Sequence, residues 1–254
     1  MNTISLIPAT SNFHQLLTIY TFIYTWVIFF GIMYKYVYNI QLSNMFIGGF
    51  IMTNETKVKV VTADPSALGL FGLAIITLVA SSQKLGLTSG VSLVFPWAIF
   101  LGASAQLMAS INDFKHNNTF GATAFGAYAF FWYAVGFTWL MQNGIFGEKL
   151  AAACDTKQLG FAYLGYLIFT IFMTIGAMET HKVLFTIFVL IDFLFLGLSL
   201  SSFGIMEHAT HMLAAYSELA IAIVSFYGCG AAVLNTHFGR EFLPVGKPFG
   251  IFKK

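Results

Sequence analysis

Apolar stretches separated by short polar breaks recur along most of the chain. They predict six helices, near 67–83, 93–111, 120–142, 159–178, 183–203 and 213–235. Each has about 17–23 residues, enough to cross a hydrocarbon core of roughly 30 Å at about 1.5 Å per residue. The breaks are too short for a second domain. The pattern predicts an all-α integral membrane protein with a six-helix domain at 67–235, a lead-in at 52–66 and a tail at 236–254.

The first 51 residues differ from the rest of the chain. Residues 16–34 are apolar and long enough to span a bilayer. No Lys or Arg precedes Lys35, which argues against a cleaved signal peptide. The segment is either an additional helix or translated upstream sequence, with Met52 as the true start. We favour the second interpretation, because Ile47-Gly48-Gly49 can be encoded by a bacterial ribosome-binding sequence just before the Met52 codon.

The composition agrees with a membrane protein. Only 9% of the residues are charged, 58% are hydrophobic, and 29 are Phe. Soluble domains carry about 25% charged residues. The net charge of +2 is also too small to suggest a nucleic-acid partner. These counts exclude soluble, disordered and nucleic-acid-binding classes.

The distribution of basic residues predicts the orientation. With six spans, both ends and the second and fourth loops share one side of the membrane. That side carries Lys57, Lys59, Lys115, Lys182, Arg240, Lys247, Lys253 and Lys254. The other side carries Lys84, Lys149 and Lys157. Because cytoplasmic loops are enriched in Lys and Arg, both termini are predicted to be cytoplasmic, in a multi-pass protein of the cell membrane.

Two acidic residues fall within predicted spans. Asp192 lies in the middle of the fifth, and Glu218 lies near the start of the sixth. An ionisable group in hydrocarbon is costly, so a functional or paired role is expected for each. Both are candidates for proton coupling, with the alternative that each is held by a neighbouring helix.

Two further polar clusters lie at helix ends. Residues 113–119 gather polar groups at the start of the third helix, where free N–H groups and the helix dipole favour a carboxylate. Glu207, His208 and His211 form the sequence EHATH, which is not the H-E-x-x-H of zinc hydrolases. We interpret EHATH as a short polar extracellular loop. We expect no metal site, no cofactor and no enzyme activity.

Three motifs resemble those of the acetate uptake transporter family, which comprises bacterial succinate–acetate permeases and yeast ammonia/acetate exporter relatives. The first is ADPSALGL, similar to N-P-A-P-L-G-L. The second, NTFGATAFGAYAFFW, covers 118–132, and the third, VLNTHFGREFLPVG, covers 233–246. The first contains the signature positions Asp64, Pro65, Leu68, Gly69 and Leu70. The resemblance extends from about residue 62 to 246, with the motifs in the expected order.

The resemblance implies six helices per subunit, a hexameric ring with a path in each protomer, and uptake of acetate, often succinate, with protons. It places a hydrophobic constriction at Leu73, Tyr128 and Ile191. Leu73 replaces the family's Phe, so a smaller side chain stands where the family has a ring. Ala232 replaces an acid common in the family, so Asp192 is a candidate to substitute for it.

These observations lead to the hypothesis of a proton-coupled transporter for short carboxylates. The substrate-binding residues are predicted to be Asn118, Thr119, Gly121 and Thr123. The alternatives are a passive channel for weak acids or neutral solutes, a metalloenzyme using EHATH, and a sensor or assembly protein that does not transport.

Overall fold

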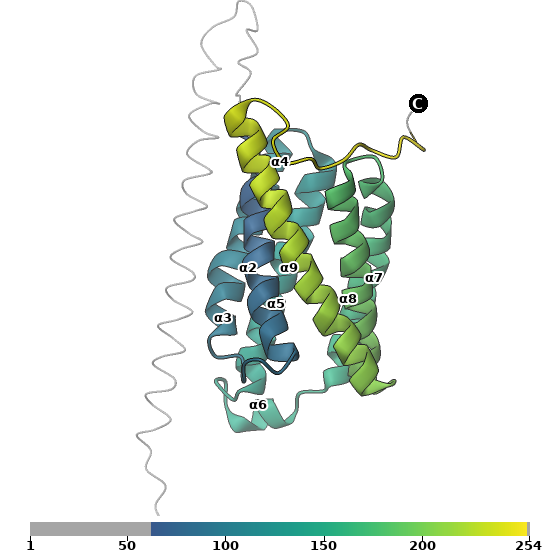
Figure 1. Ribbon diagram of the computed structural model, residues 1–254. Coiled ribbons are helices and arrows are strands. Elements are labelled where there is room, and N and C mark those ends of the chain that lie inside the picture. The colour runs from purple at the N-terminus through teal and green to yellow at the C-terminus, as the bar shows by residue number, and fades with distance from the viewer. Residues whose placement is uncertain (1–61, 253–254) are drawn as a thin grey trace, which may run out of the picture. The chain divides into compact units, whose positions relative to one another are not determined.

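The computed structural model describes residues 62–252, in which all the regular secondary structure is helical (Figure 1). The predictions for residues 1–51 lie outside the described residues. Six segments are long and apolar enough to cross a membrane, as predicted. They are α2 (Ser66–Lys84), the composite span Val94–Lys115, α5 (Thr119–Gln142), α7 (Thr156–Ala177), α8 (Lys182–Ser202) and α9 (Glu207–Phe238). A short helix, α6 (Glu148–Ala152), lies between α5 and α7.

The second span is not a uniform α-helix. It consists of α3 (Val94–Pro96), the π-helix η1 (Trp97–Ala103) and α4 (Ser104–Lys115). The wider π turn begins directly after Pro96, which has no N–H to donate to a preceding carbonyl. Ser104 Oγ donates to the Ile99 carbonyl at 2.8 Å, which satisfies an acceptor inside the π segment.

The last helix is longer than predicted, and one interpretation of the sequence was wrong. EHATH does not form a loop, because α9 begins at Glu207 and includes His208 and His211 in its first turns. The 32 residues of α9 extend about 48 Å, more than a hydrocarbon core requires. Its polar first turns can therefore extend beyond the apolar layer while remaining helical.

The helices pack as an antiparallel bundle with small residues at the contacts. α2 packs against α9 and the second span, α8 packs against α7 and α9, and α4 and η1 pack against α5. A Cβ on Gly72 would lie 2.8 Å from Ala105 Cβ, and one on Gly197 would lie 2.6 Å from the Thr210 carbonyl oxygen. Glycine is required at both positions because neighbouring helices approach this closely.

The outer face is apolar, as a lipid-facing surface requires. Phe100, Phe161 and Phe172 are all largely exposed, whereas Thr170, Ser199 and Ser225 are buried. This arrangement places apolar side chains outside and several hydroxyls inside. It supports the interpretation of the low charge content as a membrane signal.

The carboxyl-terminal segment crosses one end of the bundle (Figure 1). Asn235 Oδ1 accepts hydrogen bonds from the Phe242 and Leu243 N–H groups at 2.7 and 2.8 Å. Farther along, Glu179 Oε1 accepts from the N–H groups of Ile251 and Phe252. The asparagine of the third motif thus fixes the turn that sends the tail across the helix ends.

Candidate functional site: a neck between two polar helix ends

The three predicted constriction residues come from three helices and lie in one buried cluster. Leu73 of α2, Tyr128 of α5 and Ile191 of α8 are 7%, 5% and 3% exposed. We call these three residues the neck. Since each comes from a different part of the chain, only the tertiary fold brings them into the same interior.

The Tyr128 hydroxyl supplies a polar group to the neck. It lies 3.0 Å from Thr170 Oγ1 on α7. Thr170 Oγ1 itself donates to the Tyr166 carbonyl at 2.7 Å, so its hydrogen is already used. Tyr128 is therefore the donor and Thr170 the acceptor, and this pair fixes the Tyr128 ring.

Two aromatic side chains outside the predicted constriction extend the neck toward the start of α5. Phe120 and Phe188 make an edge-to-face contact with centroids 5.6 Å apart, and Phe188 lies 6.2 Å from Tyr128. A Cβ on Gly176 would lie 2.7 Å from the Phe120 ring. The absence of a side chain at Gly176 therefore leaves room for the Phe120 ring. The helical spacing from Phe120 to Tyr128, two turns on one face, was a usable signal.

Asp192 follows Ile191, but its side chain turns toward α7. Its Oδ2 accepts a hydrogen bond from Thr174 Oγ1 at 2.7 Å. Its Oδ1 is buried and has no hydrogen-bond partner. Thr174 lies one turn after Thr170, on the same face of α7. Two hydroxyls one turn apart on α7 thus contact Asp192 and the Tyr128 hydroxyl separately.

The start of α5 already holds a carboxylate of the protein. Asn118 caps the helix, with its Oδ1 accepting from the Gly121 N–H at 3.1 Å, and its Nδ2 donates to Asp113 Oδ1 at 3.0 Å. Asp113 is 2% exposed, and its Oδ2 has no hydrogen-bond partner. Asn118, Thr119 and Thr123 are exposed, while Gly121 is buried against Asp113. The sequence interpretation did not include Asp113 among the site residues.

The first signature motif starts α2 and packs it against α5. Asp64 Oδ1 accepts from the Ser66 N–H and hydroxyl at 2.9 and 2.6 Å, so it serves the first turn as an asparagine would. A Cβ on Gly69 would overlap the Phe125 ring of α5. Pro65 precedes the helix, Leu70 is buried, and Leu68 is exposed. These contacts explain the motif by helix capping and packing.

Glu218 is paired rather than isolated. Its Oε2 lies 2.8 Å from Lys84 Nζ, at the end of the bundle opposite the start of α5. His211 Nε2 donates to the Lys84 carbonyl at 3.2 Å. Within residues 62–252 no group of His, Cys, Asp and Glu could hold a metal ion. The described part of the chain therefore gives EHATH a structural contact and no metal site.

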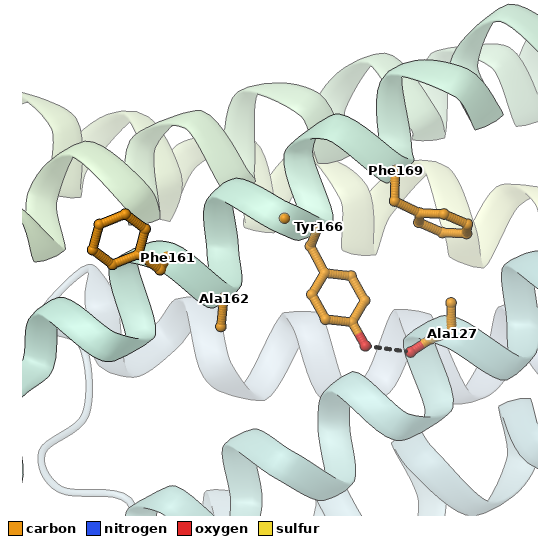
Figure 2. Close-up of a pocket in the computed structure, with 6 residues that line it drawn as sticks. Ala127, Phe161, Ala162, Tyr166 and Phe169 are labelled. Atoms are coloured by element: carbon orange, nitrogen blue, oxygen red, sulfur yellow. Dashed lines mark hydrogen bonds between the residues drawn. The ribbon is translucent and has the colours of Figure 1, made fainter.

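A shallow groove of about 320 Å³ lies between α5 and α7. It is lined by Ala127, Phe161, Ala162, Gly165, Tyr166 and Phe169. Figure 2 shows the Tyr166 hydroxyl directed at the Ala127 carbonyl, to which it donates at 2.9 Å. Together with the Tyr128–Thr170 pair, this bond joins α5 to α7. Two of its lining residues, Tyr166 and Phe169, are in ring contact with Tyr128 of the neck, with centroids 6.4 and 6.0 Å apart.

A solved structure shares this architecture, and other known proteins are similar to the chain in sequence. The structure of a protein described as the bacterial acetate channel SatP superimposes with a TM-score of 0.68 and 30% identity, over 73% of this chain and all of that chain. The succinate-acetate/proton symporter SatP of Escherichia coli is 32% identical over 186 residues, which are 73% of this chain and 96% of that protein. Acetate permease A of Emericella nidulans is 29% identical over 143 residues, or 53% of this chain and 47% of that protein.

A family profile provides the assignment. The profile of the GPR1/FUN34/yaaH family matches residues 46–243. The matched relatives with described activities are transporters or channels, not enzymes, in agreement with the prediction from sequence. The chain therefore belongs to the GPR1/FUN34/yaaH family, whose motifs were identified in the sequence and whose six-helix fold it shares.

Proposed function

We propose that this protein carries acetate, or another short carboxylate, across a membrane together with protons. The observation that carries the proposal is the buried neck inside a six-helix membrane bundle, with a Tyr128–Thr170 hydroxyl pair beside it. The similarity to a succinate-acetate/proton symporter supports the substrate class. A neck with hydroxyls and no charge of its own suits a small, weakly polar solute.

Proton coupling follows from the electrostatics of the neck. A bare carboxylate entering an apolar layer loses its hydration, at a free-energy cost much greater than that of the neutral acid. Three neck side chains and the surrounding aromatic rings offer no cation to offset this cost. A substrate that crosses with its proton therefore avoids most of the barrier, whereas hydrated ions are excluded.

Asp192 is the proposed proton carrier beside the neck. Its unpartnered Oδ1 is available to take a proton, and Thr174 holds the other oxygen at 2.7 Å. Thr170 and Thr174 provide two hydroxyls between this carboxyl and Tyr128. The substitution Asp192→Asn keeps the size and the Thr174 contact while removing the titration.

The start of α5 is the proposed substrate-binding site at the predicted cytoplasmic end of the path. Asn118, Thr119 and Thr123 are exposed at or near this helix end, and Gly121 keeps its backbone close to Asp113. An acetate anion here meets the partial positive charge of the helix but also the Asp113 carboxylate. A proton shared between the two carboxyl groups removes that repulsion. Binding at this end thus also favours substrate with a proton.

Uptake of labelled acetate by proteoliposomes, with and without an imposed pH gradient, tests the proposal. We expect accumulation driven by an inward proton gradient, and a reduced dependence on that gradient in Asp192→Asn. Failure to transport any short carboxylate would refute the function. Full proton dependence in Asp192→Asn would remove Asp192 from the mechanism. A competition panel of formate, propionate, lactate and succinate then defines the preferred substrate.

A passive channel is the second candidate function, because the matched solved structure is described as a channel. The same neck would then conduct weak acids in both directions without obligatory coupling. One measurement separates a channel that passes the acetate anion from the symporter: anion flux through a channel carries current and follows an imposed membrane potential, whereas one acetate moving with one proton is electroneutral.

We further propose assembly as a homohexamer in the cell membrane, with both termini cytoplasmic. The large apolar side chains on the outer face are compatible with either lipid or a neighbouring copy. Native mass spectrometry of protein in nanodiscs measures the subunit number. Labelling of a single cysteine placed in the carboxyl-terminal tail, in intact and in permeabilised cells, determines the side.

A further inference from the structure

The ion pair Lys84–Glu218 lies at the end of the bundle where neither the neck nor the start of α5 is located. Among residues 62–252 it is the only ion pair, and it joins the end of α2 to α9. The Glu218 side chain is 2% exposed, but the Lys84 side chain is 14% exposed. The acid is therefore enclosed by protein, while part of the cation remains accessible from this end.

A polar line leads from this pair to the neck. On α2, the buried residues Leu73, Thr77 and Ser81 and the cation Lys84 recur every three or four residues, so they share one helical face. On α9, Ser225 lies seven residues after Glu218. On α2, Thr77 lies seven residues before Lys84, so both hydroxyls are the same number of residues from the ion pair. Since α2 and α9 are antiparallel neighbours, Ser225 lies near the level of Thr77.

Direct contacts and an unfilled hydrogen bond support this alignment. A Cβ on Gly228 of α9 would lie 3.2 Å from Leu70 Cδ1 of α2, which fixes the two helices in register below Ser225. Ser225 Oγ is fully buried and has no hydrogen-bond partner. An unsatisfied hydroxyl at this depth is unfavourable, so it identifies a place where a polar guest would be stabilised.

Stability alone is a weak reason for a buried ion pair. Taking two charges out of water offsets most of their attraction, and well-packed apolar residues often serve at least as well. Here the pair terminates a polar line that reaches the neck, and its cation is the group that would attract a carboxylate. Two other titratable groups interact electrostatically with Glu218. They are His211 of α9 and Tyr163 of α7.

We propose that Lys84 is a second carboxylate-binding site, and that Glu218 is its displaceable internal ligand. A short monocarboxylate takes the place of the Glu218 carboxylate on the Lys84 ammonium, and Glu218 accepts one proton from the water on that side. One anion and one proton thus enter together, and the charge of the site is unchanged. The inference rests on the proposed transport of carboxylates, and it assigns the coupling at this end to the ion pair.

Three variants separate this role from a structural one. Glu218→Gln removes the titration and leaves Lys84 free. Lys84→Gln removes the cation. Because loss of one partner leaves the other charge buried, either single variant can fail to fold, so the double variant Lys84→Gln with Glu218→Gln provides a neutral amide pair of similar size. Thermal unfolding in detergent establishes which variants are folded before transport is measured.

The readout is the KM for labelled acetate in proteoliposomes at external pH 5, 6 and 7. We expect the wild-type KM to fall as the pH falls, and the double variant to have a KM raised about tenfold or more that no longer varies with pH. If Glu218→Gln folds, its KM is low and independent of pH. A folded double variant with the wild-type KM and pH dependence would overturn the inference. Absence of uptake by the wild type would instead refute the proposed function.

Discussion

Gly121 is the position where one added methyl group tests the architecture of the proposed binding site at the start of α5. In Gly121→Ala the new Cβ would overlap Asp113 Oδ2 and Asn118 Nδ2, and it would lie 2.9 Å from Asp113 Cγ. Real Cβ contacts essentially never fall below 3.0 Å, so one of these two side chains must move. Asp113 is enclosed by its surroundings, and Asn118 is held by the cap. The substitution therefore breaks the contact between them.

The size of the effect follows from the two hydrogen bonds. Loss of an Asn cap costs about 1 kcal/mol, and loss of a hydrogen bond to a charged group costs about 1.5–3 kcal/mol. Ala is about 1 kcal/mol better than Gly within a helix, which offsets part of the loss. We therefore expect the free energy of unfolding to fall by about 2 kcal/mol. For a chain of this size the midpoint temperature falls by roughly 4–8 °C.

The assay is thermal unfolding of the purified protein in detergent, followed by Trp fluorescence, with Gly165→Ala as the matched control. Gly165 is also helical, but a Cβ there meets no atom within 4 Å. Its Ala variant is expected to unfold at or above the wild-type midpoint. A midpoint for Gly121→Ala no lower than that of Gly165→Ala would refute the described packing of Asp113 on the start of α5.

Three other predictions use the same purified protein. Tyr128→Phe should lower the free energy of unfolding by about 1 kcal/mol. Thr170→Val leaves the Tyr128 hydroxyl unpaired and should lower the free energy of unfolding by about 1–3 kcal/mol. The opposite order of the two variants in thermal unfolding would contradict the assignment of Tyr128 as the donor. Leu73→Ala should lower the free energy of unfolding by about 2–5 kcal/mol and raise succinate uptake relative to acetate uptake. An unchanged ratio of the two uptakes in the competition panel would argue against a neck at Leu73. Burial lowers the pKa of His181 from its ordinary value of 6.5, and a nearby acid opposes this shift. The His181 Nδ1 accepts a hydrogen bond from the Leu184 N–H. Because the unfolded chain takes up that proton more readily, stability should fall as pH drops below about 6.5; His181→Asn keeps a cap and should flatten this part of the pH profile of thermal unfolding.

The number of spans was accessible from the sequence because it depends on a local signal, whereas the constriction stays a prediction that comes from the family resemblance. Helix length and apolar content predict six crossings, and the motifs point to Leu73, Tyr128 and Ile191. The full extent of α9 was not accessible by hydropathy. Polar residues past the edge of the membrane look like a loop although nothing in Glu207–His211 prevents a helix.

The hydrogen-bond partners could not be predicted, since they depend on rotation and register between helices. Nothing near Thr174 or Thr170 in the sequence indicates that they face Asp192 and Tyr128. Likewise, Lys84 and Glu218 are 134 residues apart, and only the packing of α2 on α9 brings them together. The π-helix after Pro96 also depends on its environment, because most prolines near a helix start are followed by ordinary α turns.

The acids inside the bundle have different hydrogen-bond partners, and this difference bears on the proposed transport. Asp113 is held by the Asn118 amide and Asp192 by the Thr174 hydroxyl, whereas Glu218 alone has a cation. A carboxylate substrate is attracted by a cation but repelled by an acid whose partner is neutral. The Lys84 end therefore suits the anion, and the other two acids suit the protonated substrate. In the proposed mechanism the proton must join the substrate before the neck, which is why the variants at Glu218 and Asp192 are expected to change proton dependence in separable ways.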